Sequence, residues 1–196
     1  MELHTSIGPA RTTISGIAER AGVQRHTVYA HFPDERELFR SCAGLWQSRN
    51  PFPDVSAWAA IDDTRRRTET ALDAVYRYYE RTARDLVPVF EHAERVPAME
   101  EALAAREEQL ASIARLLTRG RGARGRRRMR IVAAVTHALR LETWRSLVES
   151  AALTRNEAVA LMAGLVELAD APARSRRLPA SAVGAGGDRV AQARRA

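Results

Sequence analysis

The chain has 196 residues and a formal net charge of +7, and 45% of its residues are hydrophobic, which is enough to build a core. Its longest apolar run, near residues 131–139, is far below the roughly 20 residues of a membrane span, and no signal-peptide pattern opens the sequence. The single cysteine, Cys42, excludes an internal disulfide, so we expect a cytoplasmic protein without membrane contact.

The positive charge is unevenly distributed. Residues 119–130 hold seven arginines and no acid, residues 171–196 hold six arginines and one acid, and residues 1–46 hold five of each. Net charge therefore does not identify a DNA-binding segment. We expect the arginine-rich stretch 119–130 to be a solvated loop rather than a nucleic-acid site.

The first elements in chain order are two short helices that meet at a glycine. Thr13 is placed to cap a helix from Ile14, and the left-handed stop residue of that helix is Gly22. Val23 is expected to turn inward, and a second helix is predicted from about Gln24 to His31. The apolar stripe of the first helix comprises Ile14, Ile17, Ala18 and Ala21, at the spacing of one helix face.

Long helices are predicted for the rest of the chain. Asp34 and Glu37 form a capping-box pattern for a helix that should turn five side chains inward: Leu38, Phe39, Cys42, Leu45 and Trp46. Further helices are expected over residues 62–85, from Pro97 to about residue 117, over residues 126–149 and after a capping box at Thr154 and Glu157. Pro88 is expected to bend or break the chain, and glycines make residues 120–125 a loop.

Few β-branched runs and modest glycine and proline content favour an all-α protein. We predict three segments: a small N-terminal domain (1–48), a helical domain (54–170) and a disordered tail (171–196), which lacks apolar periodicity. The final helix is apolar nearly all round, so it needs cover on all sides. A second copy of the chain would supply it, with two helices from each subunit forming a four-helix bundle. The alternative is a helix buried within its own domain.

The stretch IAERAGVQRHTVYAHF, residues 17–32, fits a helix-turn-helix unit, whose second helix lies in the major groove of DNA. The second helix carries no acid, as phosphate binding requires, and is expected to expose Gln24, Arg25, His26, Thr27, Tyr29 and His31. Arginine reads guanine edges and glutamine can read adenine, whereas Thr, Tyr and His more often contact phosphate. A two-helix corner alone also fits an ordinary helical core.

The same residues resemble the N-terminal motif of the tetracycline-repressor (TetR) family of bacterial transcriptional regulators. The matching positions are Thr13, Ile17-Ala18, Ala21-Gly22-Val23, Thr27, Tyr29, His31-Phe32 and the segment from Pro33 to Leu38. The resemblance covers residues 8–40. A looser likeness to the family's penultimate helix extends over residues 138–150.

The resemblance implies a homodimer that binds a double-stranded DNA operator and releases it when an unknown small-molecule effector binds. Thr13, Thr27, Tyr29 and His31 would then contact phosphate, and Gln24, Arg25 and His26 would face bases. Arg36 stands where the family often has a backbone-contacting lysine.

The chain departs from the family at its start. The family places a full helix before this motif, and the seven residues before Gly8 are too few for that helix. We therefore expect either a start codon assigned too late or a chain without the first helix. The second possibility supports a rival function: a helical ligand-binding or interaction protein with a degenerate head that does not bind DNA.

Other residues carry weaker expectations. Six side chains are candidates for an effector pocket, although aromatic residues at helical spacing are more often core: Trp58, Tyr76, Tyr79, Phe90, His137 and Trp144. No Cys or His cluster has metal-ligand spacing, and no phosphate-binding glycine loop or hydrolase motif occurs. We therefore expect no metal, no cofactor and no enzymatic activity.

Overall fold

The computed structural model describes residues 2–91 and 93–172, so the predicted tail lies almost wholly outside the described residues. The described part contains helices and no strand, which confirms the all-α class. Its α-helices are α1 (Glu2–Ile7), α2 (Ile14–Ala21), α3 (Arg25–His31), α4 (Glu35–Arg49), α5 (Val55–Ala59), α6 (Thr64–Phe90), α7 (Glu100–Thr118), α8 (Gly125–Ala138), α9 (Leu141–Trp144) and α10 (Arg155–Asp170).

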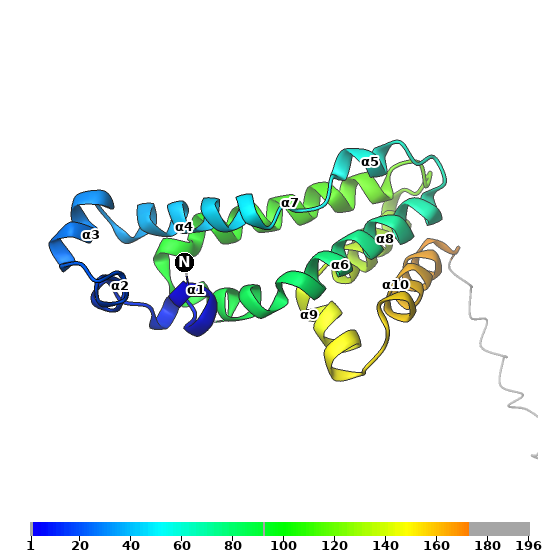
Figure 1. Ribbon diagram of the computed structural model, residues 1–196. Coiled ribbons are helices and arrows are strands. Elements are labelled where there is room, and N and C mark those ends of the chain that lie inside the picture. Colours follow the sequence, from blue (N-terminus) through cyan, green and yellow to red (C-terminus); the bar gives the residue numbers. More distant parts are fainter. Residues whose placement is uncertain (1, 92, 173–196) are drawn as a thin grey trace, which may run out of the picture.

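The molecule is elongated, with α2 and α3 at one end and α10 at the other (Figure 1). We call α1 to α4 the head and α5 to α10 the body. Helix α1 packs against α6 of the body, and α4 contacts the 3-10 turn Pro97–Met99 that precedes α7. Arg40 of α4 also pairs with Glu101 of α7 at 2.9 Å. Two helices of the head therefore contact the body.

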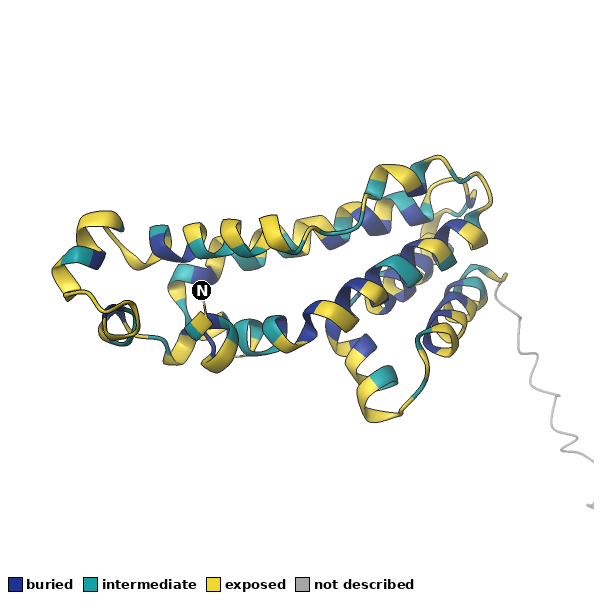
Figure 2. Cartoon of the chain, in the orientation of Figure 1, coloured by how far each residue is buried: buried dark blue, intermediate teal, exposed yellow. Residues whose placement is uncertain are grey.

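Buried positions gather along α6 (Figure 2), which packs against α10, α7 and α9. Leu72, Val75 and Tyr76 on this helix are fully buried, at the spacing of one helix face. A second, smaller cluster joins Ile14, Ala18, Val28 and Leu38. The head thus has a core of its own, and α6 organises the core of the body.

A short helix precedes the glycine corner, in agreement with the expectation that the residues before Gly8 are too few for a full first helix. Helix α1 has six residues, and its His4 is buried against the ring of Phe39 at a centroid distance of 5.1 Å. Directly after its end, Gly8 has a φ of 80°, and a Cβ built there would lie 2.4 Å from the carbonyl oxygen of Pro88. Only glycine accommodates both the dihedral and the close approach.

The helix predicted over residues 126–149 is divided. Helix α8 ends at Ala138, and the hydroxyls of Tyr76 and Tyr79 donate hydrogen bonds to the carbonyls of Ala138 and Leu139, at 3.0 and 2.8 Å. These contacts satisfy carbonyl groups that a helix end leaves without partners. After α9 the chain continues as a π-helical turn, Arg145–Ser150.

Two further expectations are wrong, and a third is narrowed. Pro88 lies in the last turn of α6, which continues to Phe90, so of the expected bend or break the break is excluded. Leu45 and Val23 were expected to point inward, but their side chains are 47% and 41% exposed. Leu45 satisfies the apolar spacing of its helix, yet its side chain stays largely exposed.

The arginine-rich stretch is not wholly solvated, because the side chain of Arg121 is completely buried. Its guanidinium pairs with Asp170 at 3.1 Å and donates to the hydroxyl of Thr68 at 3.0 Å. Arg127 also pairs with Asp170, at 2.6 Å. These contacts join α6, the loop after α7 and the end of α10, so Arg121 serves the fold.

The capping box at Thr154 and Glu157 is present at the start of α10, as the sequence predicts. None of the described helices combines the length and the apolar character that crossing a membrane requires.

The Arg121 contacts yield a stability prediction. Replacing Arg121 with Met should lower the free energy of unfolding by about 3 kcal/mol, because it leaves a partly buried carboxylate with one partner fewer. Arg128→Met is the matched control, since Arg128 is an exposed residue of the same stretch, and should change stability by less than about 0.5 kcal/mol. Urea unfolding followed by circular dichroism measures both, and equal effects would contradict a buried role for Arg121.

Candidate nucleic-acid interface

The corner between α2 and α3 is built by local hydrogen bonds. The hydroxyl of Thr13 accepts a hydrogen bond from the Gly16 amide at 3.1 Å and so caps α2. Gly22 has a left-handed conformation with φ 66°. The amides of Gly22 and Val23 donate to the carbonyls of Glu19 and Ala18, at 3.1 and 3.0 Å. This Schellman pattern ends α2 sharply and sends the chain into α3.

Helix α3 turns one face inward and the other to solvent. Val28 is buried against α2 and α4 residues of the head core, and Phe32 is partly buried there. Arg25, His26 and Tyr29 of the same helix are exposed, and Tyr29 is 45% exposed. The base-facing side chains expected from the sequence are therefore available to a partner.

The other predicted contact residues surround this face. Gln24 is the N-cap residue of α3 and makes no side-chain capping bond, so its amide is available. Thr13, His31 and Arg36 are exposed, and Thr27 is partly exposed. All eight predicted DNA-contact residues thus lie on α3, at the start of α2 or at the start of α4.

The charge of this surface suits an anion. Helix α3 itself contains Arg25 and two histidines and no acid. The arginine nearest along the chain on α2, Arg20, pairs with Glu2 of α1, whereas Arg25 and Arg36 have no ion pair within the described residues. Exposed cations around a helix that fits a DNA groove favour phosphate contact.

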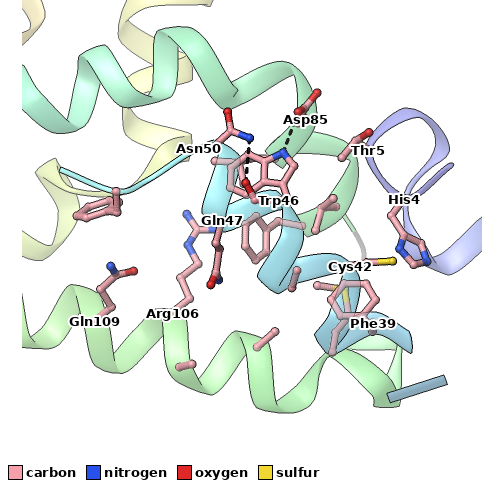
Figure 3. A pocket seen from close by; sticks show the side chains of 18 of the residues that line it. His4, Thr5, Phe39, Cys42, Trp46, Gln47, Asn50, Asp85, Arg106 and Gln109 are labelled. Carbon is pink, nitrogen blue, oxygen red and sulfur yellow. Dashed lines mark hydrogen bonds between the residues drawn. The ribbon is translucent and has the colours of Figure 1, made fainter. Parts of the chain in front are cut away.

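A cavity of about 540 Å³ lies behind this surface, between α1 and α4 of the head and α6 and α7 of the body (Figure 3). Volumes in this range are typical of small-molecule sites. Its walls carry six aromatic side chains: Phe39, Trp46, Phe52, Tyr78, Tyr79 and Phe90. The indole Nε1 of Trp46 donates to a carboxylate oxygen of Asp85 at 2.8 Å, which ties α4 to α6.

The six side chains proposed from the sequence for an effector pocket do not come together here. Tyr79 and Phe90 line the cavity. Trp58, Tyr76 and Trp144 belong to the buried core of the body, and His137 is exposed on α8. The prediction that these six side chains form one pocket is therefore wrong. Helical spacing predicts that an aromatic side chain is buried, but it does not predict whether that side chain packs in the core or lines a cavity.

Several cavity residues carried no local signal in the sequence. Arg106 is one of 31 basic residues, and its guanidinium lies over the ring of Phe90, with Cζ 4.1 Å from the ring centroid. Burial raises the pKa of Tyr79 to about 12, and the neighbouring Arg106 partly offsets that shift. His4 also lines the cavity, and its Nδ1 is buried without a hydrogen-bond partner in the described structure.

Within the described residues, no group of three or more His, Cys, Asp or Glu side chains is placed to hold a metal ion.

Comparisons with known proteins agree with the geometry of the head. Residues 1–42 match the model of the family described as bacterial regulatory proteins, tetR family. No curated protein and no solved structure matches the chain. The family match covers the corner, α3 and the first half of α4, and it confirms the resemblance predicted from the sequence.

His4 yields a prediction on pH. Burial lowers its pKa to about 4 from the ordinary value of 6.5. Between these values the unfolded chain binds more protons than the folded chain, so the free energy of unfolding falls as the pH drops through this window and is unaffected by His4 above it. His4→Phe keeps a ring against Phe39 and removes the titrating group.

On going from about pH 8 to about pH 5, the free energy of unfolding should therefore fall more for wild type than for His4→Phe. Urea unfolding at the two pH values measures it. An equal difference in unfolding free energy between wild type and variant at both pH values would show that burial does not hold His4 neutral.

Proposed function

We propose that this chain, whose residues 1–42 match the model of bacterial regulatory proteins, tetR family, is a cytoplasmic homodimeric DNA-binding repressor of that family, which a small-molecule effector releases from its operator. In this proposal residues 1–48 bind DNA, and residues 54–170 bind the effector and form the dimer. The exposed outer face of α3 is the single observation that carries it.

Base reading is assigned to the outer face of α3. Gln24, Arg25 and His26 stand at the start of this helix, and the N-terminal residues of a recognition helix contact base edges. A guanidinium can form two hydrogen bonds to guanine, and an amide can do the same with adenine. The side chains assigned to phosphate contact flank them: Thr13, Thr27, Tyr29, His31 and Arg36.

Dimer formation is assigned to α8 and α10. These helices pack against each other, and four of the eight large hydrophobic side chains that are exposed in the described structure lie on them: Met129, Leu161, Leu165 and Leu168. The three leucines follow one face of α10, at i, i+4 and i+7. Covering their exposed area contributes about 25 cal/mol for each Å² of apolar surface removed from water, which favours pairing with the same face of a second copy.

Effector release is assigned to the cavity between the head and the body. A ligand shifts a conformational equilibrium only by the difference in its affinity for the two states. Because this cavity has walls from α1 and α4 as well as α6 and α7, a displacement of the head changes its shape and hence the affinity. By the same linkage, an effector that fits one head position disfavours the other.

The rival function is a helical ligand-binding or interaction protein with a degenerate head that does not bind DNA. It rests on the absence of a full first helix, although the six residues of α1 pack against α6, and measurement of DNA binding separates the two functions.

Arg25→Ala tests the DNA proposal. In gel-shift titrations with the DNA flanking its own gene, the variant should lose about 1–3 kcal/mol of discrimination at one base pair, because a base-edge contact is removed. Arg36→Ala should weaken binding to all sequences equally and reduce the salt dependence, as for a phosphate contact. Arg84→Ala, on the exposed side of α6, is the control and should leave binding unchanged. No binding by wild type at any salt concentration would refute the proposal.

Leu165→Asp tests the dimer. We expect wild type to sediment at twice the chain mass and the variant to sediment as a monomer, because a carboxylate in an apolar interface loses its hydration. Leu45→Asp is the matched control, since Leu45 is 47% exposed and lies on α4, away from the proposed interface. A monomeric wild type at all concentrations, or dissociation of both variants alike, would contradict the assignment.

A further inference from the structure

The cavity between head and body is aromatic on several sides. Trp46 and Phe52 contact the ring of Tyr78 edge-on, at centroid distances of 6.4 and 5.1 Å. Phe39 and Phe90 close other parts of the wall. Flat aromatic walls favour a flat ligand, because stacked and edge-to-face ring contacts stabilise it beyond the area they bury.

Arg106 is the one arginine among the described residues that line this cavity. It is half-buried and has no ion pair within the described structure, although arginines elsewhere on α7 and α8 do. The ring of Phe90 holds its guanidinium in place. A positioned, partly desolvated guanidinium without a carboxylate is suited to bind an anionic group of a ligand.

A second polar group in the wall also lacks a partner. His4 is 8% exposed, and its Nδ1 has no hydrogen bond within the described structure. Buried polar atoms are almost always hydrogen-bonded to protein or to ordered water, so this atom is open to a partner that occupies the cavity, either a water or a ligand. His4 belongs to α1 of the head, whereas Arg106 belongs to α7 of the body.

The carboxylate in the cavity wall, that of Asp85, already has a hydrogen-bond partner. The carboxylate of Asp85 accepts the Trp46 indole N–H, and Figure 3 shows Asp85 and Arg106 on opposite sides of Trp46. An anionic ligand group therefore has one favourable position, next to Arg106, and is repelled from the other wall.

We propose that the cavity binds a flat aromatic anion, an acid on a system of two or three rings, whose charged group pairs with Arg106 while its rings lie among the aromatic walls that α4 and α6 supply. This inference rests on the proposed function for the statement that such a ligand is the effector. Cavity volume supports the size of the ligand, and the unpaired guanidinium supports its charge.

Two fluorescent probes with the same ring system test the proposal on the full chain without DNA. The anion is 8-anilino-1-naphthalenesulfonate, and the neutral analogue is N-phenyl-1-naphthylamine. Arg106→Met should raise the dissociation constant of the sulfonate at least about tenfold, as expected for a lost hydrogen bond to a charged group, and should leave that of the neutral probe unchanged. Arg106→Lys keeps the charge and should restore part of the affinity.

Two control variants locate the probe. Arg115→Met removes an exposed arginine of the same helix that does not line the cavity, and should change neither constant. Ala105→Trp narrows the cavity from an exposed position of its wall, and should weaken both probes. Circular dichroism confirms that each variant is folded.

The proposal is overturned if Arg106→Met affects the binding of both probes equally or of neither. It is also overturned if Ala105→Trp leaves sulfonate binding intact, because the probe would then bind elsewhere, for example on the leucine face of α10. The titrations need no operator. If Arg106→Met weakens the sulfonate alone but the protein never binds DNA, the proposed ligand class stands and the repressor function is refuted. If the protein binds DNA but Arg106→Met has no selective effect, the repressor function stands and the ligand class is refuted.

Discussion

The arrangement of this molecule depends on a close approach between two backbones. Gly8, between α1 and α2, lies so near to α6 that a Cβ would be 2.4 Å from the carbonyl oxygen of Pro88. Its positive φ excludes most other residues as well. This contact fixes the start of the head against the body. Because of it, α1 can contribute His4 to a cavity whose other walls lie in the body.

The same arrangement connects the two binding sites that we propose. The helices of the head carry the DNA-facing surface at their outer end and part of the cavity wall at their inner end (Figure 1). Between them lies one helix, α4, held to α6 by the hydrogen bond from Trp46 to Asp85. Coupling between ligand and DNA then requires no long pathway, since the same rigid head takes part in both sites.

The corner and its exposed face could be predicted from the sequence because local interactions build them. The Thr13 cap, the left-handed Gly22 and the capping box at Thr154 each involve residues three to five positions apart. The end of α8 could not be predicted, because it depends on hydroxyls of Tyr76 and Tyr79 that are 62 and 60 positions away. Burial of Arg121 depends likewise on Asp170, 49 positions away. The packing of whole helices decides which aromatic side chains line the cavity, so the sequence does not predict them.

The central claim is that two copies of α3 read DNA together from opposite sides of a twofold axis. The most direct test is selection of bound sequences from a random pool of duplex DNA by the full-length wild-type protein. Our account predicts enrichment of two inverted half-sites with a fixed separation, since operator symmetry mirrors that of the dimer. Enrichment of no sequence, or of a single half-site without an inverted partner, would contradict it.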